Sequence, residues 1–318
     1  MKIGYFLSSE EHGPRDLVRH AKMAQDNGFE SLWISDHFHP WNDEQDQSPF
    51  VWGTIGALSE AVTLPITTAV TCPTVRIHPA VIAQAAATAA VQTEGRFVLG
   101  VGSGEALNEH VLGDHWPSAD VRLEMLEEAI GLIRTLHQGD EVTHHGKHYT
   151  VENARIYTVP ERPVPIHVSA FGPKAVKVAA RCGDGYVSVG PAGELVEKYR
   201  SEGGRGPAQS GLKVCYDKSE EDAVKTAHRL WPNDALPGEL AQVLPTPKHF
   251  EQASELVTPE MIRDAMPCGP DPEQYAKKIK EFADAGFDEV HVQQIGTNQQ
   301  EFFEFWVKEV VPLLDSQA

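Results

Sequence analysis

The sequence lacks any concentration of positive charge. It has 27 Lys and Arg residues against 46 Asp and Glu, which gives a net charge of −19 over 318 residues. No run of basic residues interrupts this balance. Because phosphate backbones and anionic membrane surfaces repel such a protein, we expect neither a nucleic acid nor a membrane as its partner. A small-molecule substrate is the remaining expectation.

Cysteine pairs and long apolar segments are also missing. Cys72, Cys182, Cys215 and Cys268 are far apart and form no CxxC motif. Neither a disulfide framework nor a structural zinc site is therefore predicted. The first residues carry no export signal, and no apolar run is long enough to span a bilayer. These absences predict a protein of the reducing cytoplasm.

Short apolar runs alternate with amphipathic segments along the chain. Strands are expected at 2–7, 31–34, 66–70, 97–101, 165–169, 185–189, 212–216 and 289–293. Helices are expected at 16–27, 79–92, 121–136, 173–180, 195–200, 272–285 and 299–314. Alternation of strand and helix implies parallel pairing. Eight strands favour an α/β fold of the closed (β/α)8 TIM barrel type over an open Rossmann sheet.

Two segments interrupt this alternation. Residues 140–159 contain Gly, His and Tyr and suggest a hairpin-like excursion. Residues 217–266 form a long insertion rich in charge, proline and helix-forming residues. Long insertions in compact domains are usually lids or interface elements. We expect a single barrel domain over residues 1–318 that carries these two insertions.

The densest group of reactive side chains follows the second expected strand. Residues 35–41 read Ser-Asp-His-Phe-His-Pro-Trp, at the carboxyl end of a strand, where parallel barrels have their active sites. Histidine is suited to proton transfer near neutral pH, which makes His37 a candidate acid or base. The spacing of His37 and His39 also allows a metal-dependent hydrolase. No second histidine pair or late carboxylate follows at later strand ends, so no metal is predicted.

Three further strand ends carry candidate residues. Glu10 follows the first strand and would face the barrel mouth, although an acidic turn before a helix is also an ordinary cap. Residues 69–74 offer either a backbone surface for a flat ligand or a simple Thr-Pro turn. Glu105 lies beside Gly102 and Gly104, in a turn that lets a ligand approach the backbone closely. Glu105 is therefore a candidate acid, or alternatively a helix cap.

Two other segments could bind anions. Gly172 and Pro173 stand at an expected helix start, where free backbone amides favour a phosphate. In the long insertion, Lys248 and His249 pair a cation with an imidazole, which could reach an anionic substrate or simply begin a solvated helix.

Taken together, these motifs resemble the luciferase-like barrel superfamily, and within it the oxidoreductases that use the deazaflavin coenzyme F420. The group of F420-dependent glucose-6-phosphate dehydrogenases is the most similar. The resemblance covers most of the chain and is carried by residues 35–38, Trp41, 72–74, 79–84, 104–109 and 183–185.

The resemblance implies a catalytic role for four residues. His37 would take the proton from a substrate alcohol as a hydride leaves its carbon for the deazaflavin. Trp41 would lie over the reacting centre, Glu105 would donate a proton or act electrostatically near the ring, and Glu10 would orient the histidine. Such a site needs chiefly to hold two carbons close, exclude water and handle one proton.

The resemblance also implies a cofactor site. The ring of F420 would be lined by Asp36, Thr74, Gly104 and a bulge at Ala69 and Val70, which in such relatives contains a non-prolyl cis peptide. The phosphate and tail would be held by the segment that contains Ser169, Ala170, Gly172, Pro173 and Lys174.

The match to a sugar-phosphate site is only partial. Lys248 and His249 match part of the expected cationic cluster, but Ala192 and Asp264 stand where Lys and Arg are expected, with Arg263 next door. Each lost charge-assisted contact removes about 1.5–3 kcal/mol of phosphate binding. We therefore expect a different alcohol, or a sugar without that phosphate placement, while reduction of a carbonyl or enone stays open.

Three other functions stay open at this point. An FMN-dependent monooxygenase or reductase would keep the fold and change the cofactor, the metal-dependent hydrolase would use His37 and His39, and a non-catalytic protein would bind a ligand on the barrel. The resemblance further implies a homodimer.

Overall fold

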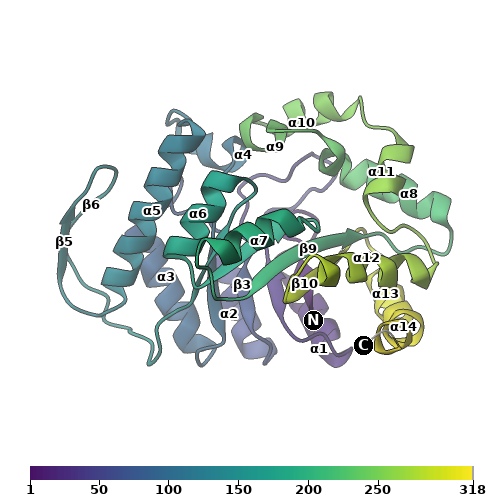
Figure 1. Ribbon diagram of the computed structural model, residues 1–318, viewed down its shortest axis with the longest axis horizontal. Coiled ribbons are helices and arrows are strands. Elements are labelled where there is room, and N and C mark those ends of the chain that lie inside the picture. The colour runs from purple at the N-terminus through teal and green to yellow at the C-terminus, as the bar shows by residue number, and fades with distance from the viewer. Residues whose placement is uncertain (317–318) are drawn as a thin grey trace.

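Eight parallel strands close into a barrel in the computed structural model, which describes residues 1–316 (Figure 1). The strands are β1 (Lys2–Leu7), β2 (Leu32–Ile34), β3 (Ile66–Thr68), β4 (Phe97–Val101), β7 (Ile166–Ser169), β8 (Gly185–Val189), β9 (Ala208–Val214) and β10 (Glu289–Gln294). They follow one another around the barrel in chain order, and β10 pairs with β1 to close it. The predicted (β/α)8 barrel is confirmed.

Helices cover the outside of the barrel. They are α1 (Pro14–Asp26), α2 (Val51–Ala61), α3 (Pro79–Gln92), α5 (Ala119–Leu136), α6 (Pro173–Cys182), α7 (Gly193–Ser201), α12 (Pro272–Asp284), α13 (Gln299–Phe305) and α14 (Val311–Asp315). Two details correct the expectation. Helix α2 was not predicted, because Gly53 and Gly56 lower its helix propensity. The expected helix 299–314 is interrupted by a π-helical turn at Trp306–Val310.

Strand β9 begins four residues earlier than expected, at Ala208 rather than at residue 212. Its first residues are small or polar, which hides them from a search for apolar runs. This segment contributes polar side chains to the inside of the barrel, where Gln209 Oε1 lies 2.9 Å from His167 Nδ1. A polar strand segment is stable there because its side chains are paired.

The two faces of each strand differ in polarity. Outward side chains, such as those of Leu99 and Val292, pack with the helices in the main apolar core. Inside the barrel, the ring of Trp33 stacks on His291 at 4.3 Å, and Ser31 Oγ lies 2.9 Å from His291 Nε2. A Cβ at position 4 would lie 2.2 Å from the His291 ring, so only glycine fits beside it. His291 therefore packs inside the barrel and is not one of the residues at its carboxyl end.

The first insertion is a hairpin, as predicted. Strands β5 (Val142–His145) and β6 (Thr150–Ala154) pair in antiparallel fashion, and the hairpin projects from one side of the barrel in Figure 1. The Glu128 carboxylate on α5 accepts hydrogen bonds from the backbone N–H groups of Lys147, His148 and Tyr149 at 3.0–3.1 Å. These bonds hold the turn of the hairpin against the barrel.

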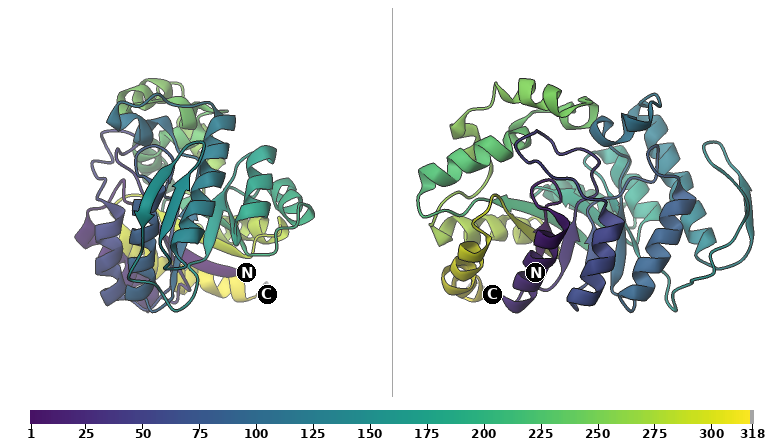
Figure 2. Two further views of the ribbon diagram at one scale, coloured as in Figure 1. Left: turned by 90° about the vertical axis from the view of Figure 1, so that its left-hand side faces the viewer. Right: turned by 180° about the vertical axis from the view of Figure 1, so that it is seen from behind.

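The second insertion is helical. It contains α8 (Glu220–Leu230), a 3-10 turn (Pro232–Ala235), α9 (Leu240–Val243), α10 (Pro247–Ser254) and α11 (Pro259–Ala265). Its two ends meet where the backbones of Cys215 and Cys268 form an isolated parallel β-bridge. Figures 1 and 2 show this segment, in green, arching above the barrel on the side of the strands' carboxyl ends.

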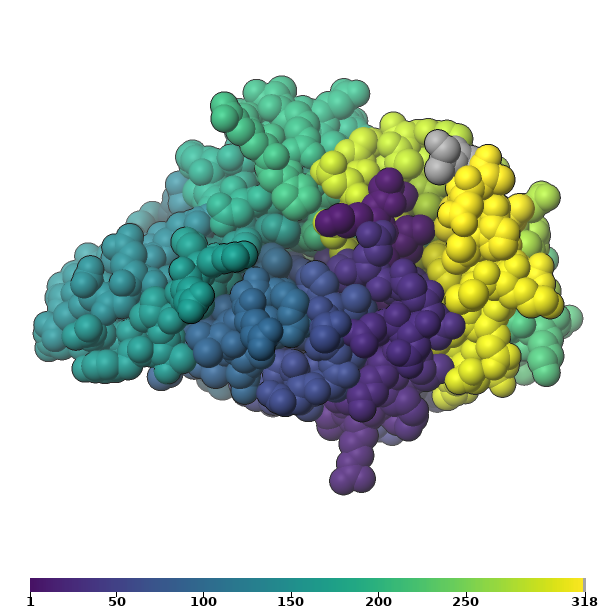
Figure 3. Space-filling view, turned by 90° about the horizontal axis from the view of Figure 1, so that it is seen from below, coloured from purple at the N-terminus to yellow at the C-terminus, as the bar shows by residue number. Residues whose placement is uncertain are grey.

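The N-terminal segment, in purple, lies beside helices α13 and α14, in yellow (Figure 3). The ring of Tyr5 on β1 packs on Phe303 of α13 with centroids 4.9 Å apart, and the Tyr5 hydroxyl donates to Gln299. No helix within residues 1–316 is both long and apolar enough to cross a bilayer.

Two buried histidines contribute to the acid sensitivity of the fold. The His12 and His20 rings meet edge to face at 4.6 Å, with 9% and 5% of each residue exposed. Burial lowers the pKa of His12 from 6.5 to about 4 and that of His20 from 6.5 to about 3. Both side chains are therefore uncharged in the folded protein at neutral pH.

We expect His12 and His20 to lower the free energy of unfolding as the pH drops below about 6.5, because the unfolded chain then binds protons at these residues that the folded chain does not bind. Each unit of pKa shift corresponds to about 1.4 kcal/mol. In His20→Leu the loss between pH 6.5 and pH 4 is smaller, as measured by urea unfolding at several pH values. The exposed His145→Leu serves as control, and an equal pH slope in His20→Leu and the wild type would contradict this account.

Candidate active site

Four predicted residues meet at the carboxyl end of the barrel. His37 Nε2 lies 3.4 Å from Glu10 Oε1 and 3.7 Å from Glu105 Oε2, and the His37 ring lies 5.1 Å from the Trp41 ring. They come from the loops after β1, β2 and β4. Parallel strands bring their carboxyl ends to one edge of the barrel, which is why residues so far apart in sequence converge here.

Glu10 is buried and held by two serine hydroxyls. Its Oε2 accepts hydrogen bonds from Ser8 Oγ at 2.9 Å and from Ser35 Oγ at 2.8 Å. Ser35 Oγ in turn accepts from the backbone N–H of Ser9 at 2.9 Å. This leaves Oε1 of Glu10 as the oxygen that faces His37.

Trp41 is fixed from its backbone and from its ring. Its backbone N–H donates to Gln45 Oε1 at 2.8 Å, and Gln45 Nε2 donates to the carbonyl oxygen of Leu230 in the insertion at 2.8 Å. The Trp41 ring meets Phe250 of α10 edge to face at 5.0 Å. The long insertion thus forms the wall behind this indole.

Glu105 is the most accessible of the four catalytic candidates, with 28% of its side chain exposed. It precedes the short helix α4 (Ala106–Glu109). Partial burial raises the pKa of its carboxyl above the ordinary value, and the nearby His37 opposes this. Asn108 on α4 donates to Glu105 Oε2 at 3.3 Å. A carboxyl with a raised pKa holds its proton more readily than an ordinary glutamate side chain.

Asp36 belongs to a buried ion-pair network. Arg76 Nη2 donates to Asp36 Oδ1 at 2.8 Å, and the Thr71 hydroxyl donates to Asp36 Oδ2. Arg76 Nε lies 3.6 Å from Glu109 Oε1, and Glu109 Oε2 accepts from the backbone N–H groups of Val75 and Arg76. This network ties together the loops after β2, β3 and β4.

The predicted ring-binding residues form a surface of small groups. The peptide between Ala69 and Val70 is cis, as expected. A Cβ at Gly102 would lie 2.8 Å from Val70 Cγ2 and 3.7 Å from Ser169 Cβ, so three strand ends approach one another here. Gly104 has a φ of +89° and lies against Thr74 and Trp116. The buried Thr74 hydroxyl has no hydrogen-bond partner in the described part of the chain.

The predicted phosphate segment begins helix α6. Gly172 is its N-cap with no side-chain hydrogen bond, and Pro173 is the first helical residue. A Cβ on Gly172 would meet nothing within 4 Å, so the space before the helix is open. The Ala170 carbonyl accepts from the Tyr186 hydroxyl at 3.0 Å. Lys174 is exposed and paired with Asp120 at 2.7 Å.

The proposed substrate cations lie apart from this cluster. Lys248 and His249 are exposed at the start of α10, where His249 Nδ1 bonds with Thr246 Oγ1 at 2.6 Å. Arg263 is paired with Glu220 at 2.7 Å. Ala192 is the N-cap of α7, and Asp264 is exposed on α11. Among residues 1–316, no ion pair or hydrogen bond joins Lys248 or His249 to the catalytic cluster.

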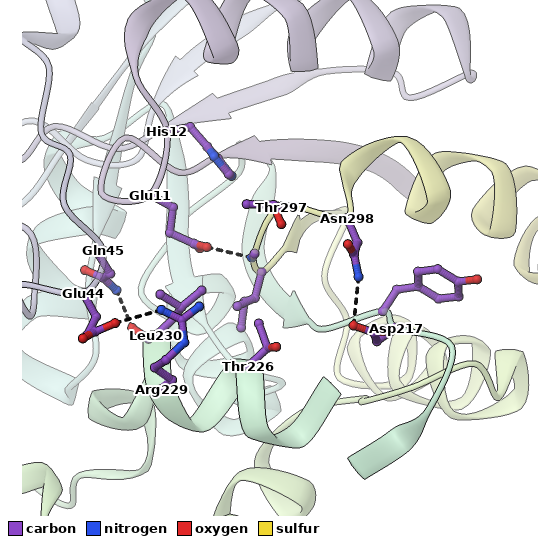
Figure 4. Close-up of a pocket in the computed structure, with 13 residues that line it drawn as sticks. Glu11, His12, Glu44, Gln45, Asp217, Thr226, Arg229, Leu230, Thr297 and Asn298 are labelled. Atoms are coloured by element: carbon purple, nitrogen blue, oxygen red, sulfur yellow. Dashed lines mark hydrogen bonds and ion pairs between the residues drawn. The ribbon is translucent and has the colours of Figure 1, made fainter. Parts of the chain in front are cut away.

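A polar cavity of about 310 Å³ lies between the insertion and the loops after β1 and β10, and its lining includes Glu11 and Gln45 but none of the four catalytic candidates (Figure 4). Glu11 reaches its wall, where Oε2 accepts from Gly296 N at 2.7 Å and Oε1 accepts from Trp231 Nε1 at 2.5 Å. Burial raises the pKa of Glu11 to about 7, although these hydrogen bonds oppose the shift. Above this wall, Lys213 Nζ lies 4.4 Å from the Trp231 ring centroid and 3.0 Å from Asp234.

His37 and His39 do not face a common point. His39 Nδ1 lies 3.0 Å from the Leu107 carbonyl, whereas His37 Nε2 faces the two carboxylates. In the described chain, no group of three His, Cys, Asp or Glu residues is arranged to hold a metal ion, and the four cysteines are free thiols.

The model of one protein family, described as luciferase-like monooxygenase, matches residues 1–289. The chain belongs to this family. Two curated relatives are F420-dependent glucose-6-phosphate dehydrogenases, one from Kribbella flavida at 37% identity and one from Amycolatopsis mediterranei at 35%, and each alignment covers 99% of this chain and 98% of the relative.

Solved structures of this luciferase-like family are also similar. An F420-dependent secondary alcohol dehydrogenase in complex with an F420-acetone adduct has a TM-score of 0.91 and 31% identity, with 98% of each chain covered. The F420-dependent tetrahydromethanopterin reductase of Methanopyrus kandleri has a TM-score of 0.78 at 21% identity, which shows the shared fold.

The sequence analysis missed the residues that hold the catalytic ones. Ser8 and Ser35 orient Glu10, Arg76 holds Asp36, and Asn108 contacts both His37 and Glu105. One signal for Asn108 was available, because it lies three residues after Glu105 and so shares a face of any helical turn that begins there. The others are revealed only by the folded geometry.

We expect Arg76→Met to destabilise the fold by about 3–5 kcal/mol, because it leaves the Asp36 and Glu109 carboxylates buried without their cation. Chemical unfolding measures the change. Arg181→Met, which removes an exposed ion pair with Glu127, is the control and should cost at most about 1 kcal/mol. Equal losses in the two variants would show that the buried network contributes nothing special.

Proposed function

We propose that this protein is an F420-dependent dehydrogenase that transfers a hydride from the carbon of an alcohol or sugar hydroxyl to coenzyme F420. The observation that carries the proposal is the cluster of His37, Glu10, Glu105 and Trp41 at the mouth of the barrel. Full-length identity of 35–37% to curated F420-dependent dehydrogenases supports it, as does the similar secondary alcohol dehydrogenase structure.

The residues around the barrel mouth fit a flat ring with an anionic tail. Only glycine fits at positions 102 and 104, where a Cβ would meet Val70 and Trp116, so no side chain projects there, and the buried Thr74 hydroxyl beside Gly104 is a polar group without a protein partner in the described chain. The open space at Gly172 leaves the first amides of α6 available to a phosphate, which helix N-termini favour. Ser169, Ala170, Pro173 and Lys174 belong to this same segment.

When bound, F420 supplies the two-electron acceptor for the hydride. The chain's own residues handle the proton. His37 Nε2 is the ring nitrogen that faces the mouth, and it takes the proton of the substrate hydroxyl. Glu10 stabilises the charged imidazolium from 3.4 Å, and Glu105 lies 3.7 Å away as the accessible group that exchanges a proton with solvent. Trp41 covers the reacting centre and excludes water from it.

A neutral alcohol or sugar suits this site better than a sugar phosphate. Arg263 is engaged by Glu220, Ala192 supplies no charge, and Lys213 in the mouth is neutralised by Asp234. A phosphate dianion would also approach the carboxylates of Glu10 and Glu105, which costs free energy through like-charge repulsion.

The first experiment is a titration of the purified protein with oxidised F420 and with FMN, followed by cofactor fluorescence. We expect F420 to bind tightly and FMN weakly. Alcohols and sugars, including glucose 6-phosphate, are then screened for bleaching of F420 absorbance. His37→Ala should keep its F420 affinity and lose about 10²–10⁴-fold in turnover, because it removes only the proton acceptor.

The exposed His145→Ala is the matched control and should turn over like the wild type. Tighter binding of FMN than of F420 would contradict the proposal and favour an FMN-dependent monooxygenase or reductase. Equal turnover of His37→Ala and the wild type would remove His37 from the mechanism.

The proposal includes a homodimer that buries the outer face of α2 and α3. Helix α3 has no charged residue in a chain of net charge −19. Its exposed positions include Val81, Thr88 and Val91, and the neighbouring α2 exposes Gly53 and Ala57. A surface of small, uncharged side chains is the kind that a second copy can cover closely.

Thr88→Glu places a charge in the middle of this face, and we expect it to yield a monomer. Light scattering after gel filtration should give twice the chain mass of 34.9 kDa for the wild type and a single chain mass for the variant. Lys277→Glu, on the exposed side of α12, should leave the mass unchanged. A monomeric wild type would refute the dimer.

A further inference from the structure

Asn108 is buried at the centre of the catalytic cluster, with 4% of the residue exposed. Its Oδ1 accepts hydrogen bonds from the backbone N–H groups of Phe38 at 2.9 Å and His39 at 3.2 Å. Because only the amide oxygen can accept from two N–H groups, the orientation of this amide is fixed. The Asn108 NH₂ group therefore points toward His37 Nδ1, at 3.1 Å, and toward Glu105 Oε2, at 3.3 Å.

This orientation decides where neutral His37 carries its proton. An amide NH₂ donates and does not accept, so His37 Nδ1 must offer a lone pair to it. A neutral imidazole has one ring proton, which is then on Nε2. Around that nitrogen lie two carboxylate oxygens, Glu10 Oε1 at 3.4 Å and Glu105 Oε2 at 3.7 Å, whose negative potential attracts the proton.

The opposite tautomer has one contact in its favour. The His39 carbonyl oxygen lies 3.2 Å from His37 Nδ1 and would accept a proton from it. In that form, however, the Nε2 lone pair would face the oxygens of Glu10 and Glu105, and the Nδ1 proton would face the Asn108 NH₂ group. Both juxtapositions are repulsive, so the tautomer with the proton on Nε2 is favoured.

We propose that Asn108 is a positioning residue that keeps the ring proton of neutral His37 on Nε2. The inference rests on the proposed function for its consequence, because Nε2 is the nitrogen that takes the substrate proton. For alcohol oxidation the Nε2 proton first passes through Glu105 to solvent, and Nδ1 takes one proton from solvent and donates a hydrogen bond to the His39 carbonyl. The ring stays neutral, and Glu10 keeps the charge that stabilises the imidazolium formed when Nε2 takes the substrate proton.

The resting site accordingly presents an N–H donor to whatever oxygen enters the mouth. A carbonyl oxygen only accepts hydrogen bonds, whereas a hydroxyl entering as a proton donor needs a lone pair on Nε2. The resting protein is thus matched to the carbonyl partner of the reaction, and the alcohol must wait for the change of tautomer.

The test is ¹⁵N NMR of protein labelled at histidine, with no cofactor or substrate present. The His37 signals are assigned by their loss in His37→Gln, at a pH where His37 is neutral. We expect a one-bond coupling to hydrogen at Nε2 and none at Nδ1. Asn108→Asp keeps an oxygen for the two backbone N–H groups and replaces the NH₂ donor by an acceptor. In this variant the coupling should appear at Nδ1.

Asn42→Asp is the matched control. Asn42 is a buried residue of the loop that carries His37, and its side-chain amide bonds to the Leu230 carbonyl and to the backbone N–H of Gln45. Because it does not contact His37, its variant should show the wild-type coupling pattern. If Asn108→Asp does not fold, Asn108→Ala replaces it, because the His39 carbonyl then remains as the partner of Nδ1 and the proton should move there.

A proton on Nδ1 in the wild type overturns the proposal, and so does a wild-type pattern in both Asn108 variants. These readouts need neither F420 nor a substrate. Failure of the tautomer assignment is therefore distinguishable from failure of the proposed function, which the cofactor titration reports.

Discussion

The site depends on one guanidinium that is buried between two carboxylates. Arg76 joins Asp36, next to His37, to Glu109 at the end of the short helix that carries Asn108. Removing charges from water is costly, and the arrangement is stable because each carboxylate also receives hydrogen bonds from Thr71 or from backbone N–H groups. Through this network the ends of three strands become one rigid unit.

The positions of the proposed catalytic side chains follow from that unit. Asn108 reaches His37 only because its helix is held beside the loop after β2, and Glu10 reaches the same ring because Ser35 lies next to Asp36 in that loop. Distances of 3.1–3.7 Å around one imidazole thus depend on a contact that itself touches no reacting group. Such indirect support is usual for active sites, where rigid surroundings preorganise the reactive groups.

Much of the fold could be predicted from the sequence because strand and helix alternate with clear apolar periods. The exceptions have physical causes. Strand β9 begins with Ala-Gln-Ser-Gly, which is stable inside the barrel through Gln209 and His167 but carries no apolar signal. Helix α2 contains two glycines and an almost continuous apolar sequence, so neither propensity nor period marks it. The clustering of Glu10, His37 and Glu105 was predictable because all three follow strands of the barrel, whereas Ser8 and Arg76 act through contacts that only folding creates.

The long insertion has a different relation to the site from that of the strand ends. It reaches Trp41 through Phe250 and through the bond of Gln45 to Leu230, while His37 and the carboxylates are held by the barrel loops. Its two ends meet at Cys215 and Cys268, so it leaves the barrel and returns at one place. A segment connected in this way can diverge in evolution without disturbing the proton chemistry. New substrates would then arise by exchanging one wall of the pocket, with the reaction itself inherited unchanged.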